Sequence, residues 1–266
     1  MKTEPTAWIK NERTIRKHEY GDERISINRG GSLSRTSAVI VAAGSGSRMG
    51  GGIKKQFKEL DGVPILKRTL AVFAVLPEIH EIILVVGNDD LSFCQKEFAD
   101  CDGTGKMNVR LVEGGSNRQL SVRAGVEATD EDTEIVVVHD GVRPFIEHTT
   151  IRASIRAAEN CGAACVAVPA VETIKRVRNG YIDSTPNRKE LWIAQTPQCF
   201  RRGLFLRAMA EAERAGVTFT DDVSLIEWIG EPVEVVEGSY DNIKITTPKD
   251  LAVAEEIIRR RRNISD

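Results

Sequence analysis

The residues Val39-Ile-Val-Ala-Ala-Gly-Ser-Gly-Ser-Arg-Met49 run from an apolar stretch into a glycine loop, and Lys54-Lys55-Gln56 follows shortly after. The apolar residues 38–43 have the length and the branched side chains of a central strand in a parallel sheet. Gly44 and Gly46 then allow the backbone to turn sharply and to approach a ligand closely. We therefore predict an α/β fold in which this loop can hold phosphate groups.

The spacing of the loop residues separates this loop from two familiar nucleotide-binding loops. A dinucleotide fingerprint needs a third glycine where Met49 stands, and a P-loop needs a Gly-Lys-Ser/Thr sequence that the chain lacks. What remains is a set of cations, Arg48, Lys54 and Lys55, that suits a triphosphate undergoing substitution at phosphorus. The alternative is an ordinary strand-to-helix turn with solvated basic residues, since such turns are common.

Composition limits the classes of protein to consider. A chain of 266 residues with 41% hydrophobic residues can bury one substantial core, so we expect one α/β domain with a small excursion. The net charge of -2 gives no reason to expect nucleic acid or an anionic membrane as a partner. No stretch approaches the roughly eighteen apolar residues of a membrane span. The 5 cysteines form no CxxC pair, which favours reduced thiols in a cytoplasmic protein.

Residues 1–36 differ in composition from the rest of the chain. They are polar, they carry Gly30-Gly31-Ser32 near their end, and they lack the apolar segment of a secretory signal. Acidic residues such as Glu4, Glu12 and Glu19 disfavour an organelle transit peptide, because such peptides are poor in acids. We treat this segment as a polar extension whose role the sequence does not define.

From residue 38 onward, apolar runs alternate with amphipathic stretches, a rhythm typical of a mostly parallel sheet covered by helices on both faces. Strands are expected at 38–43, 81–86, 109–112, 135–138, 164–168 and 233–237. Helices are expected at 64–76, 88–99, 117–128, 202–215, 221–228 and from 248 through the basic residues 259–262. The dipole of the last helix favours those basic residues, so they do not require a nucleic acid.

The segment of residues 170–197 interrupts this rhythm. Val171–Val177 and Tyr181–Ser184 flank Asn179-Gly180, a strong signal for a hairpin turn, so we predict a β-arm that projects from the sheet. A two-stranded hairpin is marginal alone in water, which leads us to expect a second subunit and a homodimer. The alternative is a hairpin that folds back over its own sheet.

Further segments carry a resemblance to a known family. In chain order they are Gly114-Gly-Ser-Asn-Arg-Gln-Leu-Ser-Val122, His139-Asp-Gly-Val-Arg-Pro144, Thr173-Ile-Lys175, Leu191-Trp192, Gln195-Thr-Pro-Gln198, Thr220-Asp-Asp222 and Asp241-Asn-Ile-Lys-Ile-Thr246. Together with the first loop, they resemble the 2-C-methyl-D-erythritol 4-phosphate cytidylyltransferases of the non-mevalonate isoprenoid pathway. The first loop alone is shared by many sugar-nucleotide pyrophosphorylases, whereas the later segments are more specific.

The resemblance covers residues 37–266 and implies a Rossmann-like nucleotidyltransferase fold with a β-arm. It also implies a reaction in which the phosphate of the polyol attacks the α-phosphorus of CTP and releases pyrophosphate. Because that nucleophile is already an anion at neutral pH, no general base is needed, and catalysis rests on alignment and charge stabilisation. Mg²⁺ is implied as a cofactor held mainly by the phosphates of CTP.

The resemblance also implies roles for individual residues. Arg48 and Lys55 match the family's pair of catalytic cations; Lys54 is an alternative for the second, and we prefer Lys55 because Gln56 follows it. Nucleotide binding is implied for Ala42, Ala43, Gly44, Gly46, Gly115, Ser121 and Asp140. The chain departs from the family at Ser116, where an acidic residue is frequent, and at Gly141-Val142, where two small residues are usual.

On the polyol side, the resemblance implies a pocket and two further catalytic cations, Arg188 and Lys244, which would position the substrate phosphate. The residues implied for this pocket are Asp140, Arg143, Thr173, Arg188, Thr196, Thr220 and Lys244. The residues of the arm would enter the site of the neighbouring subunit, so the dimer and the active site form one prediction. A buried ion pair between Asp140 and Arg143 is the alternative to a binding role. We interpret His139 as structural, because an ionised nucleophile offers it no proton to remove.

Two other functions stay open at this point. A ribitol-5-phosphate cytidylyltransferase would share nearly every segment above and differ in the polyol pocket. A catalytically silent scaffold of the same fold is the second alternative, although such a protein would not need the cations Arg48, Lys55, Arg188 and Lys244 together.

Overall fold

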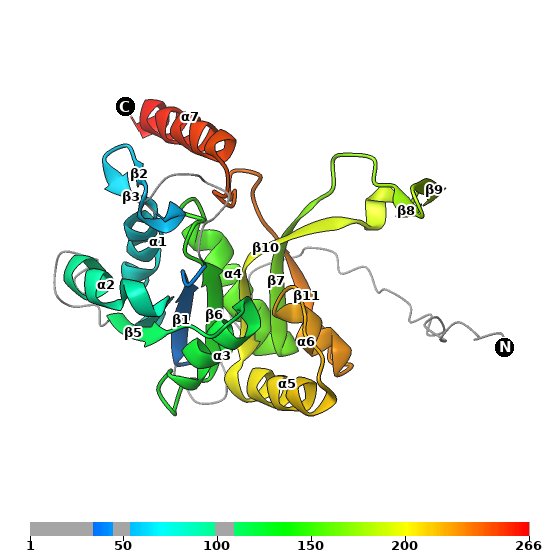
Figure 1. Cartoon of the computed structure of the whole chain (residues 1–266), viewed down its shortest axis with the longest axis horizontal. Helices are drawn as coiled ribbons and strands as arrows, with labels where there is room; N and C mark the ends of the chain where they lie inside the picture. Colours follow the sequence, from blue (N-terminus) through cyan, green and yellow to red (C-terminus); the bar gives the residue numbers. More distant parts are fainter. Residues whose placement is uncertain (1–33, 45–53, 99–108, 266) are drawn as a thin grey trace. The chain divides into compact units, whose positions relative to one another are not determined.

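A seven-stranded sheet forms the centre of the computed structural model, which describes residues 34–44, 54–98 and 109–265 (Figure 1). The strands lie in the order β11-β7-β10-β6-β1-β4-β5. Their bounds are β1 Thr36–Val41, β4 Ile79–Val86, β5 Val109–Glu113, β6 Ile135–Asp140, β7 Ala163–Pro169, β10 Trp192–Arg201 and β11 Glu234–Glu237. Strand β1 pairs in parallel with β4 and β6, and only β10 runs antiparallel to its neighbours, β6 and β7. The predicted α/β fold with a mostly parallel sheet is confirmed.

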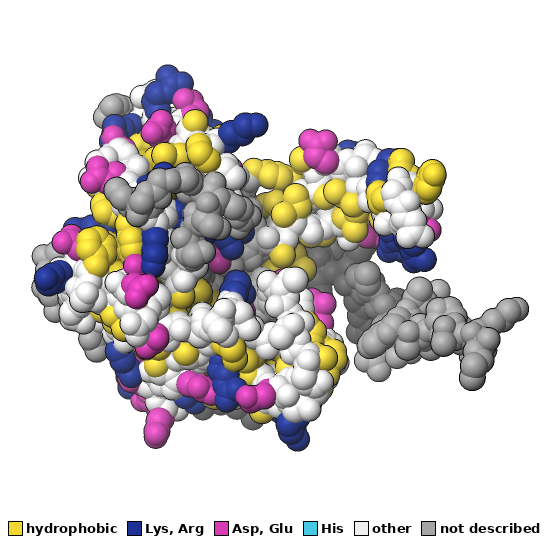
Figure 2. Space-filling model, viewed as in Figure 1, with side chains coloured by type: hydrophobic (Ala, Val, Ile, Leu, Met, Phe, Trp, Pro, Cys, Tyr) yellow, Lys and Arg dark blue, Asp and Glu magenta, His cyan; other side chains and the backbone are white. Residues whose placement is uncertain are grey.

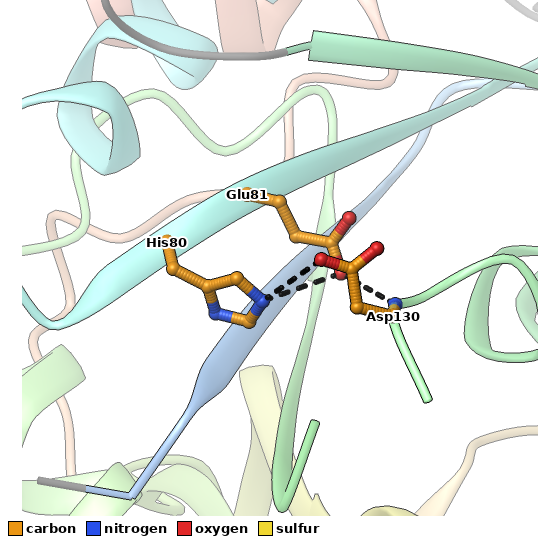
Figure 3. Close-up of side chains that lie close together, drawn as sticks. All are labelled: His80, Glu81 and Asp130. Carbon is orange, nitrogen blue, oxygen red and sulfur yellow. Dashed lines mark hydrogen bonds and ion pairs between the residues drawn. The ribbon is translucent and has the colours of Figure 1, made fainter. Parts of the chain in front are cut away.

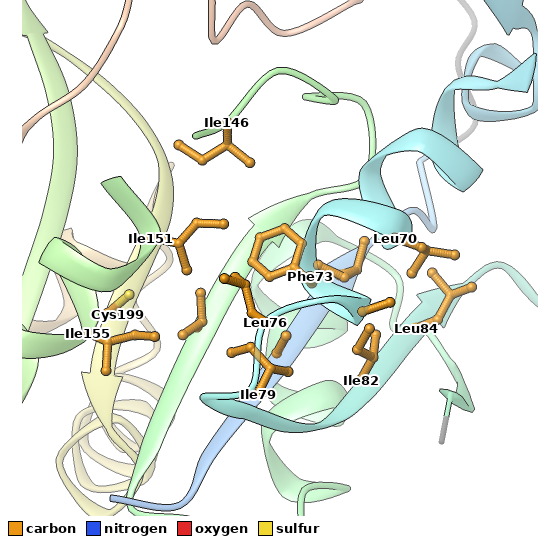
Figure 4. Packing of buried hydrophobic residues seen from close by; sticks show 14 of the residues in the cluster. Leu70, Phe73, Leu76, Ile79, Ile82, Leu84, Ile146, Ile151, Ile155 and Cys199 are labelled. Atoms are coloured by element: carbon orange, nitrogen blue, oxygen red, sulfur yellow. The ribbon is translucent and has the colours of Figure 1, made fainter. Parts of the chain in front are cut away.

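Helices α1, α2 and α4 supply one apolar layer against the sheet (Figure 4). Their bounds are Ile65–Ala74, Leu91–Phe98 and His148–Cys161. Apolar side chains from the strands meet Leu70 and Phe73 of α1 and Ile151 and Ile155 of α4 in one buried cluster. Successive residues of a strand point to opposite faces, so Ile82 and Leu84 belong to this cluster, whereas Ile83 does not.

The remaining face of the sheet packs against α3 (Arg118–Glu127), α5 (Arg202–Ala215) and α6 (Val223–Trp228). Their apolar residues form a second cluster with the alternate positions of the strands. The members of this cluster include Val39, Ile83, Val85, Val122, Val126, Val136, Val138, Phe200, Phe205 and Ile226. Helices on both faces explain why the central strands read as unbroken apolar runs, because neither side of the sheet meets water.

A third, smaller apolar cluster seats the last helix, α7 (Pro248–Ser265). Ala254 and Ile257 of this helix pack against Phe145, which follows β6, and against Ile245. Two short strands, β2 (Glu59–Leu60) and β3 (Val63–Pro64), pair next to them. The cluster fixes the chain on either side of Lys244, because Ile245 is fully buried and its backbone N–H donates to the carbonyl of Val142.

Charged side chains tie β4 to the loop that precedes β6, at the amino ends of the parallel strands (Figure 3). Glu81 is buried and accepts hydrogen bonds from Arg110, from the hydroxyl of Ser37 and from the backbone of Asp130. His80 lies 3.7 Å from the carboxylate of Asp130. Arg110 pairs with both carboxylates and Arg35 also pairs with Asp130, so the two negative charges are balanced and this group serves to hold strands together.

The strand β10 and the helix α4 were not predicted as elements. Gln195-Thr196-Pro197-Gln198 is polar and contains a proline, and prolines are rare in central strands. The sheet accommodates this polar segment in two ways. Pairing with β7 is interrupted between Ala194 and Gln198, and the side chains of Gln195 and Gln198 are buried but form hydrogen bonds. The first strand also begins two residues earlier than expected, at Thr36.

The predicted arm projects away from the main sheet, where β7 and β10 extend beyond it (Figure 1). At its end, β8 (Arg176–Arg178) and β9 (Tyr181–Ser184) form a hairpin. Asn179 and Gly180 have φ values of 51° and 82°, as the predicted turn requires. Its residues are exposed, with Tyr181 at 80% and Ile182 at 65%, so within the described residues the arm is not folded back over its own sheet.

The thiols of the described cysteines are all free. Burial raises the pKa of Cys94 to about 11 and the pKa values of Cys165 and Cys199 to about 12, which makes these thiols unreactive. Among the described residues, no helix combines the length and the apolar character that a membrane span requires.

Gly125 allows α3 to lie directly on the sheet, and this contact yields a prediction about stability. A Cβ atom there would collide with a methyl group of Val39 and would lie 2.7 Å from a methyl group of Val85. We expect Gly125→Ala to lower the free energy of unfolding by about 1–3 kcal/mol, measured by urea denaturation. The control is Gly203→Ala in α5, where nothing lies within 4 Å of the new methyl group. This substitution should raise the free energy of unfolding by up to about 1 kcal/mol. Equal effects of the two substitutions would contradict this account.

Candidate active site

A cleft of about 370 Å³ opens where β1 and β6 end and α3 begins. Functional residues in open parallel sheets gather at this edge, the carboxyl ends of the strands. The cleft is lined by Val41, Ala42, Ala43, Gly44, Lys55, Gln56, Gly115, Ser116, Asn117, Arg118, Ser121, Asp140, Val142 and Lys244. The cleft therefore brings together the first loop, the second glycine loop, the end of β6 and the segment before α7.

The loop after β1 is fixed by Gln56, which is buried and donates hydrogen bonds to the carbonyls of Ala42 and Gly44 at 2.9 and 3.4 Å. On the opposite wall, Gly114 allows the second loop to approach the first, because a Cβ atom there would lie 2.5 Å from the Cβ of Ala43. The hydroxyl of Ser121 donates to the carbonyl of Asn117 at 2.8 Å. The backbone at Ala42 and Gly44 and the start of the second loop are thus held in place before any ligand enters.

The two adjacent lysines have different environments. Lys54 donates to both carboxylate oxygens of Asp90, at 2.9 and 2.8 Å, so its charge is neutralised by that residue. Lys55 begins the short 3₁₀ helix η2 (Lys55–Phe57) and lines the cleft. This placement supports Lys55 over Lys54 as the cation that meets a ligand.

Asp140 is a buried carboxylate of the cleft with three cationic side chains near it. Its Oδ2 atom lies 3.0 Å from Nζ of Lys244 and 3.1 Å from Nε of Arg143, and its Oδ1 atom lies 3.9 Å from Nε of Arg118. Burial by itself would raise the pKa of this carboxyl, but the three cations outweigh burial and hold the pKa far below its usual range. Asp140 is therefore a permanent anion among cations from separate segments.

Arg118 also forms a bidentate ion pair with Asp222, with both distances at 2.8 Å. Asp222 precedes α6, and its backbone N–H donates to Oε1 of Gln198 in β10. Burial raises the pKa of Asp222, although Arg118 counters this effect. No role was predicted from the sequence for Arg118, Asp222 or Gln198. The signal was present, since all three lie inside the segments that carried the family resemblance.

His139 is buried beneath this charged group and has a structural role, as predicted. Its Nε2 atom lies 3.0 Å from the carbonyl of Arg143, and its Nδ1 atom lies 3.1 Å from the hydroxyl of Thr196. A carbonyl can only accept, so Nε2 carries the proton and Thr196 donates to Nδ1. Burial lowers the pKa of His139 to about 4, so the ring is neutral at neutral pH.

Other predicted site residues lie away from the cleft lining. Arg143 is 12% exposed, and it donates to the carbonyl of Asn242 as well as to Asp140, which is the buried ion pair considered above. The hydroxyl of Thr196 is buried and accepts from the backbone of Asp140. Thr220 precedes Asp221 before α6, whereas Thr173 and Arg188 lie on the exposed arm. Gly46 and Arg48 lie outside the described residues.

A larger groove of about 750 Å³ lies between α1 and α7. Its lining combines Val63, Val72, Pro144, Phe145 and Ile258 with Lys67, Arg68, Arg261 and Arg262. Neither Asp140 nor any described residue of the two glycine loops lines this groove, so the smaller cleft is the better candidate for nucleotide chemistry.

The neutral state of His139 leads to a prediction about pH. The unfolded state binds a proton near pH 6.5, whereas the folded state resists it down to about pH 4, so His139 destabilises the fold progressively as the pH falls through this window. By pH 5 this effect should reach about 2 kcal/mol of unfolding free energy. His139→Gln should be less stable at pH 7 but should lose this part of the pH dependence, as measured by urea denaturation at pH 7 and pH 5. A mutant that keeps the full pH dependence would contradict the assignment.

Comparison with known proteins agrees with this geometry. The family model of the 2-C-methyl-D-erythritol 4-phosphate cytidylyltransferases matches residues 36–260. A 2-C-methyl-D-erythritol 4-phosphate cytidylyltransferase from Alkaliphilus metalliredigens is 46% identical over 231 residues, which covers 86% of this chain and 95% of the relative. The enzyme of the same name from Desulforamulus reducens is 44% identical over 225 residues, which covers 84% of this chain and 96% of the relative.

Solved structures show the same relationship. The crystal structure of 4-diphosphocytidyl-2C-methyl-D-erythritol synthase from Anaerococcus prevotii superimposes with a TM-score of 0.76 and 35% identity, covering 86% of this chain and all of that one. The range 36–260 that the family model matches contains the residues of both glycine loops, of the charged cleft and of the arm. The chain therefore belongs to the 2-C-methyl-D-erythritol 4-phosphate cytidylyltransferase family.

Proposed function

We propose that this protein transfers the cytidylyl group of CTP to 2-C-methyl-D-erythritol 4-phosphate, releasing pyrophosphate, in the synthesis of isoprenoid precursors. Membership of the family makes the chain a nucleotidyltransferase and favours this substrate over ribitol 5-phosphate. The observation that carries the proposal is the cleft that Lys55 lines together with residues of the two glycine loops and the anionic Asp140, which has Lys244 and Arg118 beside it. A silent scaffold would have no use for buried charges arranged in this way.

The chemistry that this arrangement supports is substitution at phosphorus between two anions. The polyol phosphate and CTP repel each other, so the cleft must supply positive charge and hold both reactants in line. In our proposal Lys55 contacts the triphosphate and stabilises the charge that develops on the leaving pyrophosphate. Lys244 is 36% exposed beside Asp140, so in our proposal its ammonium group also meets a substrate phosphate. Arg48 would join Lys55 in the same role.

We include Mg²⁺ as the expected cofactor. Asp140 offers a hard carboxylate oxygen, Oδ1, that accepts no hydrogen bond from the described residues and has Nε of Arg118 3.9 Å away. One such oxygen fits an ion that takes most of its ligands from phosphates and water. When bound, the ion would neutralise triphosphate charge and polarise the phosphoryl group.

We further propose that the enzyme acts as a homodimer through the arm. The arm exposes Val177, Tyr181, Ile182, Trp192 and Ile193, and Figure 2 displays hydrophobic side chains along it. An exposed apolar surface on a projecting hairpin is costly in water, which favours burial against a second copy. In that dimer, Thr173 and Arg188 of one subunit would complete the polyol pocket of the other.

A cytoplasmic location is part of the proposal. The support comes from the described cysteines, which are free thiols and buried or partly buried, as expected in a reducing compartment. CTP and a polyol phosphate would be the binding partners, with no nucleic acid.

The test of this function is pyrophosphate release from CTP and Mg²⁺ with either 2-C-methyl-D-erythritol 4-phosphate or ribitol 5-phosphate. We expect release with the first substrate and at least about a hundredfold less with the second, because a pocket built for one set of hydroxyls rejects another. Release with ribitol 5-phosphate alone would transfer the proposal to that substrate, and release with neither would revive the scaffold.

The different environments of Lys54 and Lys55 predict different effects of substitution. Lys55→Ala should lower kcat by about a hundredfold or more through the loss of a cation in the transition state, with little change in melting temperature. Lys54→Ala is the matched control, and we expect it to act chiefly on stability through its ion pair with Asp90. Near-normal turnover of the Lys55 variant would remove that residue from the catalytic set.

The shared site predicts complementation between inactive subunits. Arg188→Ala and Lys55→Ala proteins should each be nearly inactive, but mixed dimers contain sites with both intact residues. After subunit exchange we expect the mixture to regain up to about a quarter of wild-type activity. Exchange confirmed by mass spectrometry with no recovered activity would contradict a site shared between subunits.

A further inference from the structure

We propose that Asp222 is a positioning residue: it holds Arg118 away from Asp140 and thereby keeps the Oδ1 atom of Asp140 open for the bound nucleotide. The inference rests on the proposed use of the cleft for CTP and adds two residues to which no role was assigned. It makes Arg118 a group that must be restrained, rather than one more cation that contacts phosphate.

The restraint is visible in the geometry of the ion pair. Nη1 and Nη2 of Arg118 bind the two oxygens of Asp222 at 2.8 Å each, which is the bidentate arrangement that fixes the plane of a guanidinium group. Asp222 itself is 1% exposed. Oε1 of Gln198 accepts the backbone N–H groups of Asp222 and Val223 at 3.0 and 3.1 Å, so the start of α6 is anchored to the sheet.

The two oxygens of Asp140 are used differently. Oδ2 lies within 3.1 Å of both Lys244 and Arg143. Among the described residues, Oδ1 accepts no hydrogen bond, whereas Oδ2 accepts one from Arg143, and Nε of Arg118 lies 3.9 Å from Oδ1, which is too long for a hydrogen bond. Oδ1 therefore feels positive charge but remains able to accept a bond from a ligand, and Asp140 lines the cleft.

Without the charge of Asp222, Arg118 would turn to another carboxylate. Asp221 is already engaged, because it accepts from the backbone and hydroxyl of Ser224 and from Gln198. Asp140 is the remaining acid, and a movement of about 1 Å would bring Nε to hydrogen-bond distance of Oδ1. Arg118 would then occupy the oxygen that the nucleotide needs.

Oδ1 can contact one of two parts of the bound nucleotide. One is a ribose hydroxyl of CTP, which would donate a hydrogen bond, and the other is Mg²⁺ carried by the triphosphate. Binding of CTP measured in EDTA and again in Mg²⁺ separates these two contacts, because a loss confined to the second condition identifies the ion.

The experiment is a comparison of CTP binding by calorimetry for the full-length wild type, Asp222→Asn, Arg118→Gln and the double variant. We expect Asp222→Asn to weaken CTP binding about tenfold or more, since a competing charged hydrogen bond must be displaced. Arg118→Gln alone should bind CTP within about threefold of the wild type, and adding it to Asp222→Asn should restore the affinity to that level. In pyrophosphate release, KM for CTP should rise in Asp222→Asn while kcat at saturating CTP stays within about threefold.

The direction in which Arg118→Gln changes the CTP affinity of the Asp222→Asn protein tests the proposal. If Arg118 instead contacts CTP directly and Asp222 only aims it, the double variant will bind as weakly as Asp222→Asn or more weakly, and the proposal fails. Unchanged binding in Asp222→Asn also overturns it. Glu213→Gln is the matched control. It removes the acidic partner of Arg123, which also lies on α3 but outside the cleft, so CTP binding should stay unchanged. A wild type that binds no CTP would instead defeat the proposed function.

Discussion

The carboxylate of Asp140 is the interaction on which the site depends. It is buried at the end of the central strand β6, and cations from α3, from the loop after β6 and from the segment before α7 converge on it. A buried carboxylate without such partners would take up a proton, and buried cations without the carboxylate would repel one another. The charge of Asp140 therefore binds the loop after β6 and the segment before α7 directly, while Arg118 of α3, which is held by Asp222, acts on it from 3.9 Å.

The fold supplies the rigid frame for this charge balance. Strand β6 lies between β1 and β10; Asp140 pairs with Val41 of β1 on one side, and its backbone N–H donates to the hydroxyl of Thr196 in β10 on the other. His139 and Thr196 form a neutral layer beneath it. The apolar cluster under α7 fixes Ile245, next to Lys244. Packing thus sets the position of each charge before a ligand arrives, as electrostatic preorganisation requires.

Much of the fold could be predicted from the sequence because local signals agreed with the tertiary structure. Helix α5 has the predicted bounds, and it ends where Gly216 adopts the left-handed conformation with φ of 65°. The Asn179-Gly180 turn was equally clear. Strand β10 was missed because its polar residues and Pro197 argue against a central strand, and its burial depends on hydrogen bonds to distant residues such as Ser239 and Asn242.

The site was predictable only in part, for a related reason. Glycine loops and the lysine pair are local patterns, and the structure places Gly115, Ser121 and Lys55 around one cleft. The partnership of Arg118 with Asp222 joins residues 104 positions apart, and spacing along the chain contains no sign of it. The engagement of Lys54 by Asp90, which favours Lys55, likewise appears only in three dimensions.

The most direct measurement is a crystal structure of the protein with CTP and Mg²⁺. The account predicts the nucleotide in the cleft between the two glycine loops, with Oδ1 of Asp140 contacting the ribose or the ion, Arg118 still bidentate to Asp222, and Lys55 at the triphosphate. CTP bound in the groove between α1 and α7, or Arg118 moved onto Asp140 in the complex, would contradict it.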